Sequence, residues 1–108
     1  MELNFTIDKP KIVRTVAAAD FGVNPENPDN TEALQKAVDY MAENPGTCLT
    51  FEKAVYRFAA EKQIVIHDVT DGLLNGNGAE LIWSEKGYFS VVGVCRFAVE
   101  NIYIDWDW

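Results

Sequence analysis

The sequence of 108 residues lacks long hydrophobic runs and concentrated positive charge. Its longest apolar stretches, residues 16–19 and 64–66, are far shorter than the roughly 20 residues that a membrane-spanning helix needs. No Lys/Arg cluster offsets the balance of nine basic against seventeen acidic residues, a formal net charge of −8. Such a surface repels phosphate backbones, so we expect neither a nucleic-acid partner nor a membrane partner.

Residues with metal-binding or nucleophilic side chains are few. Cys48 and Cys95 lie in apolar, strand-like stretches without a CxxC pair, which favours two buried free thiols over a disulfide or a metal site. His67 is the single histidine. Zinc chemistry or a Ser-His-Asp triad would need partners that the sequence lacks, so we interpret His67 as a surface residue at a turn. We expect no metal site and no cofactor.

The first residues predict a strand and no leader peptide. An acid stands at the second position, and no apolar core of a secretory signal follows. The protein is then either cytoplasmic or secreted with its leader already removed. Leu3, Phe5 and Ile7 alternate with polar residues, which predicts a half-buried strand that Pro10 ends. Residues 12–16 predict a second short strand.

One stretch has helical periodicity. Its apolar face consists of Ala33, Leu34, Ala37, Val38 and Met41. We expect Asp29 to cap this helix, with Glu32 as the reciprocal partner of a capping box, and Pro45-Gly46 to end it. Because the apolar stripe is rich in alanine, the helix can lie close against whatever it covers.

After Gly46 the pattern changes to short strands separated by turns. They are predicted at 48–51, 56–58, 64–66, 81–83, 89–92, 97–99 and 102–104. No gap between them has room for a crossover helix, which excludes a doubly wound sheet. The pattern of 64–66 recurs at 89–91 and that of 81–83 at 102–104, and both spacings are typical of β-solenoid coils. An antiparallel barrel or sandwich could produce the same two recurrences.

Four segments in order resemble the N-terminal end of the pectate-lyase-like right-handed parallel β-helix superfamily. They are Ala19-Asp20-Phe21-Gly22-Val23 together with 29–38, then 49–58, 74–82 and 99–105. Polygalacturonases, bacterial α-galactosidase-type β-helix enzymes and phage tailspikes begin in this way. Ala54 departs from the pattern, since that superfamily usually has glycine there, and we expect a different turn at this position.

The resemblance implies a mostly β fold. Residues 16–108 would form the N-terminal cap and first coils of a parallel β-helix, preceded by a strand segment at 1–15, with the helix closing the apolar end of the first coil. It also implies a polysaccharide-active protein, in the first place a glycoside hydrolase whose catalytic coils come later, so that this fragment alone is inactive. A non-catalytic stalk or tailspike-like carbohydrate-binding adhesin, and a small β interaction module, are the alternatives.

A pair of carboxylates is one candidate for chemistry on a sugar. Asp105 and Asp107 lie two apart on a predicted strand, so both would point to one face, roughly 6–7 Å apart. That separation approaches the one used by inverting glycosidases. In the superfamily, however, the catalytic carboxylates come from later coils, and the alternative is a solvated acidic strand end.

Large aromatic residues are the second candidate. Trp83, Tyr88 and Trp106, with Phe89 beside Tyr88, could stack on sugar rings of a carbohydrate substrate. The alternative is that these rings fill the interior of the coils. Finally, Trp106 and Trp108 belong to an apolar strand-like run that no cap follows, which predicts self-association through an open coil end.

A loop rich in oxygen ligands is predicted at residues 68–78. It contains Asp68, Asp71, Asn75 and Asn77 among three glycines. Because the spacing is not that of an EF-hand calcium loop, we interpret these as turn residues at a coil corner.

Overall fold

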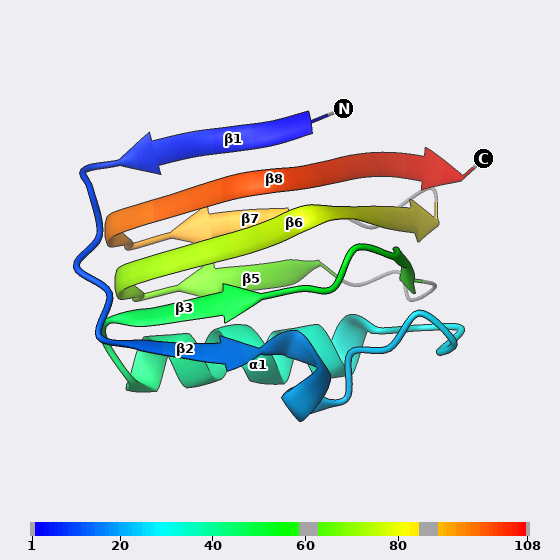
Figure 1. The fold of residues 1–108 in the computed structure, drawn as a ribbon, viewed down its shortest axis with the longest axis horizontal. Coiled ribbons are helices and arrows are strands. Elements are labelled where there is room, and N and C mark those ends of the chain that lie inside the picture. Colours follow the sequence, from blue (N-terminus) through cyan, green and yellow to red (C-terminus); the bar gives the residue numbers. More distant parts are fainter. Residues whose placement is uncertain (1, 59–62, 85–88, 108) are drawn as a thin grey trace.

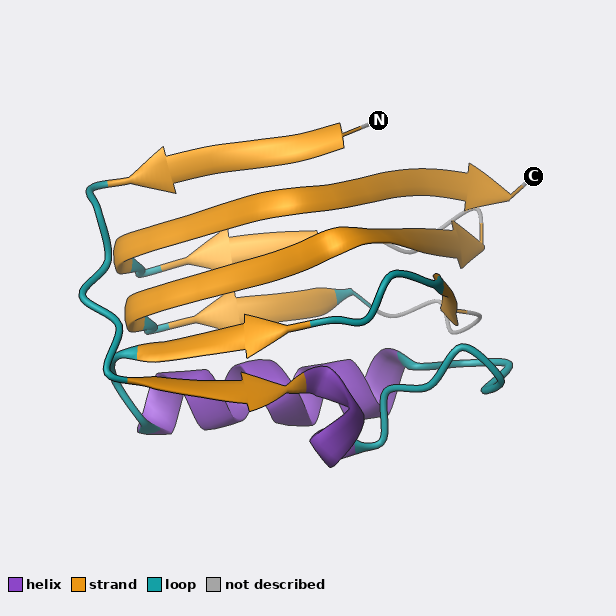
Figure 2. Ribbon diagram, viewed as in Figure 1, coloured by secondary structure: helices purple, strands orange, loops and turns teal. Residues whose placement is uncertain are grey.

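The computed structural model describes residues 2–58, 63–84 and 89–107 (Figure 1). Within these residues the fold is mostly β, as predicted, with one α-helix (Figure 2). Its elements in chain order are β1 (Glu2–Ile7), β2 (Arg14–Ala17), the 3₁₀ turn η1 (Ala18–Phe21), α1 (Thr31–Glu43), β3 (Thr47–Thr50), β4 (Val55–Phe58), β5 (Ile64–His67), β6 (Thr70–Ser84), β7 (Phe89–Val92) and β8 (Cys95–Asp107).

The strands form two sheets. One has the strand order β1-β8-β6-β3-β2, with β4 also pairing with β6, and the other consists of β5 and β7. In Figure 1 the pair β5 and β7 lies behind the larger sheet, and α1 continues this rear layer beside β5, which it contacts. Apolar side chains between the two layers form the core.

Most neighbouring strands are parallel, and their partners are separated by one constant interval along the sequence, which we call the coil spacing. It joins Thr47 to Gly72, Val55 to Glu80, Ile64 to Phe89 and Thr70 to Cys95. The predicted recurrence of 64–66 at 89–91 is therefore confirmed, since these residues are direct strand partners. Because these pairs are parallel, the chain runs in the same direction each time it returns to a sheet.

The second predicted recurrence is wrong by two residues. Leu81 pairs with Ile104 and not with Ile102. The register shifts between Asn75 and Ala79, where Asn77 and Gly78 have positive φ angles of 51° and 87°. This stretch is a bulge inside the long strand β6, so the predicted loop at 68–78 is a turn only at its beginning.

The corners of the chain repeat the same backbone conformation. Gly46, Asp71 and Arg96 follow one another at the coil spacing and have positive φ angles of 84°, 53° and 50°. Asp68 and Gly93 repeat at the same spacing, with φ angles of 55° and 65°. Asp tolerates this left-handed region better than most side chains, which explains why aspartates mark a corner.

Helix α1 forms as the periodicity predicts, but its cap is different. Asn30 holds the N-cap position, and Asp29 accepts hydrogen bonds from the Thr31 N–H (3.0 Å) and hydroxyl (2.6 Å). Glu32 is therefore the second helical residue and not the third, which excludes the predicted capping box. Leu34, Ala37, Val38 and Met41 are all buried, as expected for a helix that covers one end of the core.

Strand β1 covers part of the end that the sequence predicted to be open. It pairs antiparallel with β8, from Ile7 opposite Phe97 to Glu2 opposite Tyr103 (Figure 1). Phe5 packs on Phe97 with ring centroids 6.0 Å apart. The free edge of β8 is thus closed between Phe97 and Tyr103, and β1 and β7 become the outermost strands at this end.

Cys48 is buried and Cys95 is exposed, whereas both were predicted to be buried. Burial is the main cause that raises the pKa of the Cys48 thiol, which keeps it protonated near neutral pH. Within the described ranges, no helix is long and apolar enough to cross a membrane. The same ranges contain no group of three His, Cys, Asp or Glu side chains that could hold a metal ion.

Candidate functional site

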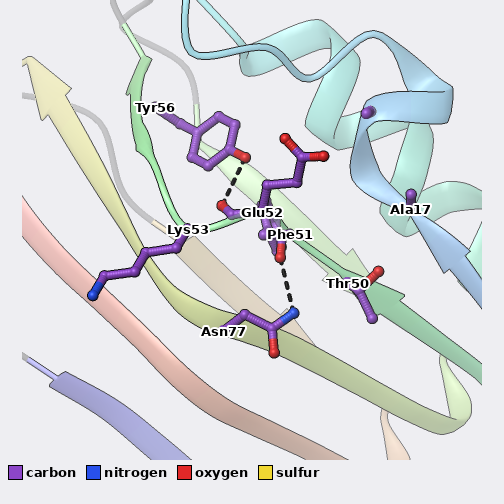
Figure 3. A pocket seen from close by; sticks show the side chains of 8 residues that line it. Ala17, Thr50, Phe51, Glu52, Lys53, Tyr56 and Asn77 are labelled. Carbon is purple, nitrogen blue, oxygen red and sulfur yellow. Dashed lines mark hydrogen bonds between the residues drawn. The ribbon is translucent and has the colours of Figure 1, made fainter.

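Two adjoining hollows on the outer face of the larger sheet share Lys53, and we call them together the Lys53 groove. The first has a volume of about 450 Å³ and is lined by Ala17, Ala19, Thr50, Phe51, Glu52, Lys53, Tyr56 and Asn77 (Figure 3). The second has a volume of about 400 Å³ and is lined by Lys53, Gly78, Glu80, Tyr103, Ile104 and Asp105.

Hydrogen bonds fix the loop between β3 and β4 that shapes the first hollow. The Phe51 N–H donates to the Asn75 carbonyl (3.1 Å), and the Asn77 side-chain amide donates to the Phe51 carbonyl (2.9 Å). The Tyr56 hydroxyl donates to the Glu52 carbonyl at 2.9 Å (Figure 3). Asn77 can reach back to this loop because the bulge in β6 turns its backbone.

Lys53 connects the two hollows. Gly78 has a φ angle of +87°, and a methyl group placed there would lie 3.5–3.6 Å from the aliphatic carbons of Lys53. The stem of Lys53 therefore lies over Gly78. In Figure 3 this side chain extends away from Tyr56. The apolar stem packs on the sheet while the ammonium group stays accessible, as long basic side chains commonly do.

The second hollow is built from a row of strand partners. Val55, Glu80 and Tyr103 are aligned across β4, β6 and β8. Glu80 alternates with the buried Ala79 and Leu81, so it points outward, and Tyr103 is 41% exposed. An exposed aromatic ring beside carboxylates and an ammonium group can stack on the apolar face of a sugar while the charged groups bond its hydroxyls.

The described residues place one of the two carboxylates predicted as a pair. Asp105 lines the second hollow, and its side chain accepts a hydrogen bond from the Trp106 N–H at 2.8 Å. Asp107 pairs with Ser84 through the backbone ladder, and its side chain lies outside the described residues. A different carboxylate, Glu80, lines the same hollow as Asp105.

The predicted sugar-stacking aromatics do not form one platform. Trp83 has no exposed surface and stacks on Phe58 with ring centroids 4.6 Å apart, so it fills the core, which is the alternative given for these aromatic residues. Trp106 is half-buried, aligned with Trp83, and packs against the core. Tyr88 lies outside the described residues.

Sequence reasoning missed most residues of the Lys53 groove. Glu52, Lys53, Glu80 and Tyr103 come from three separate stretches. The available signal was the coil spacing, which aligns Val55 with Glu80, combined with the alternation of Tyr103 with two buried isoleucines. It could have placed Glu80 and Tyr103 on one outer face.

His67 lies at a separate polar cluster between α1 and β5. Its ring nitrogens are 3.1 Å from an Asp39 carboxylate oxygen and 3.4 Å from one of Asp68. The hydrogen bond to Asp39 is the main cause that raises the pKa of His67. The side chain is 44% exposed, which agrees with the predicted surface position.

A charged corner joins Asp71 and Arg96. The Arg96 guanidinium donates to both carboxylate oxygens of Asp71, one of them at 2.9 Å, and the Lys11 N–H donates to the same carboxylate at 3.0 Å. These bonds, chiefly those from Arg96, lower the pKa of Asp71 to about 2. Because the two residues are equivalent corner positions, the pair ties consecutive corners together.

The chain matches no model of a known protein family. It is similar to Alpha-1,3-galactosidase B of Bacteroides thetaiotaomicron, with 25% identity in an alignment 115 residues long that covers 87% of this chain. The chain spans only 19% of the length of that relative. This weak similarity to a glycoside hydrolase links the chain to carbohydrate-active proteins.

Proposed function

We propose that this chain is the N-terminal part of a right-handed parallel β-helix protein of the pectate-lyase-like type that acts on carbohydrate. The observation that carries the proposal is the constant coil spacing between parallel strands in both sheets. The chain passes from β3 and β4 to the rear strand β5, returns in β6, and repeats this path through β7 to β8. Parallel crossovers of this kind are nearly always right-handed.

The ends of the chain fit the same proposal. Helix α1 stands between β2 and β3, so the interval between their partners, from Arg14 to Thr47, is longer than the coil spacing. An amphipathic helix that covers the apolar end of the stack is the expected cap of a solenoid. The bulge in β6 shortens the following interval, from Ala79 to Ile102, without changing the path of the chain.

We place carbohydrate binding at the Lys53 groove. Support comes from the exposed Tyr103 ring, from the polar groups of Glu80, Asp105 and Lys53, and from the similarity to a relative named as a galactosidase. Because the similarity covers a small share of that enzyme, we propose that the chain binds sugar without hydrolysing it.

Titration calorimetry or NMR with galacto-oligosaccharides tests this function. We expect weak binding that Tyr103→Ala abolishes, because the ring supplies the stacking surface. Val92→Ala on β7 is the matched control, since Val92 is also exposed but belongs to the other sheet. Unchanged affinity in Tyr103→Ala would place the site elsewhere. Turnover of the sugar that Asp105→Asn abolishes would instead make the groove an active site.

A further inference from the structure

We infer that a pocket beside the corners of the coils binds a small oxyanion, a sulfate or phosphate group. The pocket is lined by Lys9, Pro10, Lys11, Asp71 and Arg96 and has a volume of about 500 Å³, and we call it the corner pocket. It shares no residue with the Lys53 groove, so the inference is independent of the proposed carbohydrate binding.

The corner pocket lies on the side of the stack. In Figure 1 the connection from β1 to β2 runs past the starts of β8 and β6, where Arg96 and Asp71 form consecutive corners. This connection is one wall of the pocket, and the two corners are the other. The Lys11 N–H contacts Asp71, at the start of β6, so the two walls meet one coil before β8.

Positive charge is concentrated at the corner pocket although the net charge of the chain is −8. Three of the nine basic residues line it, against the single carboxylate of Asp71. Asp8 also lies close enough to act electrostatically on Arg96, and the surroundings remain positive. Because the rest of the chain is acidic and repels an extended polyanion, the expected ligand is a single anionic group and not a nucleic acid.

Asp71 holds the Arg96 guanidinium in one orientation. Arg96 Nε and Nη2 donate to the two carboxylate oxygens of Asp71, whose side chain is only 14% exposed. The third nitrogen, Nη1, makes no hydrogen bond to the residues that the structure describes, so its N–H groups remain available to a ligand. A guanidinium group whose orientation is already fixed loses little rotamer freedom when it binds an oxyanion.

The wall that carries the two lysines is also fixed. The Lys11 N–H donates to Asp71 at 3.0 Å, and Pro10 restricts the backbone before it. The ammonium groups of Lys9 and Lys11 form no ion pair with the described part of the chain. Two ammonium groups on one wall and a guanidinium on the other can each donate to a different oxygen of sulfate or phosphate, whereas a carboxylate offers only two oxygens.

NMR titration of the full chain with sodium sulfate and with sodium phosphate, at an ionic strength held constant with sodium chloride, tests the inference. We expect saturable shifts of the amide signals of Lys9, Lys11 and Arg96 that chloride alone does not cause. The double variant Lys9→Gln/Lys11→Gln should weaken binding at least about tenfold, because it removes two charged donors. Arg96→Lys keeps the charge but loses the planar fork of donors, so it should also weaken binding.

Lys36→Gln is the matched control, because it removes one positive charge from the exposed face of α1, outside the corner pocket. Circular dichroism establishes that each variant is folded, and the two exposed lysines provide a test even if Arg96→Lys is unstable. Shifts that do not saturate, that chloride reproduces, or that Lys36→Gln reduces as much as the pocket variants would overturn the inference. So would an Arg96→Lys variant that is folded and binds like the parent, since surface charge alone would then attract the anion.

A sulfated galactose, compared with inorganic sulfate, distinguishes two sources of the same group. Tighter binding of the sulfated sugar at the same amides would identify a saccharide sulfate as the ligand, and equal or weaker binding would identify the free ion. Neutral galacto-oligosaccharides carry no anionic group, so their binding to the Lys53 groove is measured separately and is unaffected by either result.

Discussion

The side-chain amide of Gln35 pairs with the backbone of Val65 as a neighbouring strand would. Gln35 Nε2 donates to the Val65 carbonyl at 2.9 Å, and Gln35 Oε1 accepts the Val65 N–H at 2.9 Å. Strand β5 has β7 on one side and α1 on the other. One glutamine of the helix thus satisfies a donor and an acceptor that would otherwise remain at the edge of the sheet.

Gln35→Ala should remove both bonds and destabilise the fold by about 1–3 kcal/mol, because it leaves two backbone groups without partners. Chemical denaturation measures the loss, and hydrogen exchange of the Val65 amide should accelerate. Lys36→Ala, on the exposed face of the same helix, is the matched control. Equal stability of the two variants would show that the Gln35 bonds do not hold β5 against the helix.

His67 should make stability depend on pH near neutrality. Its pKa is raised in the folded chain, mainly by the hydrogen bond to Asp39 and then by Asp68. The contribution of protonated His67 to folding stability is therefore complete below its unfolded pKa of about 6.5. It is lost as pH rises through the higher pKa of the folded chain. His67→Gln should lower the melting temperature at mildly acidic pH more than at alkaline pH. A constant difference between parent and variant at all pH values would contradict this assignment.

Asp71 should make stability depend on pH in the opposite direction, with stability lost as the pH falls. Its pKa is lowered to about 2, first by Arg96 and then by the Lys11 amide. The contribution of the ionised Asp71 to folding stability is therefore complete well above its unfolded pKa of about 3.9. It is lost as pH falls toward 2. Asp71→Asn keeps a residue that tolerates the left-handed corner, so its melting temperature should change less across this range than that of the parent. If the melting temperatures of parent and variant changed in parallel with pH, the Asp71–Arg96 pair would not be the cause of the loss of stability at low pH.

The helix and most strands were predictable because they depend on local alternation. Leu34, Val38 and Met41 lie at helical spacing, and the buried Ile64 and Ile66 lie two apart, so each pattern identifies its own element. These patterns carry no information on strand partners. For that reason the sequence predicted a strand near the start of the chain without indicating that it covers β8, near the other end.

The candidate site was less predictable because it depends on register. Trp83 and Tyr103 are both aromatic residues on strands, and only the direction of each side chain makes one a core residue and the other part of the Lys53 groove. The bulge near Asn77 changes the alignment of β6 with β8 by two residues. A shift of this kind moves every later outward residue to a new neighbour.

Two glycines of that bulge should differ sharply in their tolerance of alanine. A methyl group on Gly76 would overlap the Asn101 carbonyl oxygen and the Ile102 side chain, and the carbonyl belongs to the backbone of β8 and cannot rotate away. Relief requires β6 and β8 to separate, so we expect Gly76→Ala to cost at least about 2–3 kcal/mol.

Gly78→Ala meets only the flexible stem of Lys53, at 3.5–3.6 Å, so its cost is the strain of a positive φ angle, about 1–2 kcal/mol. Urea denaturation of both variants measures the difference in the free energy of unfolding. A Gly76→Ala variant as stable as the parent would mean that β6 and β8 are not aligned through this bulge.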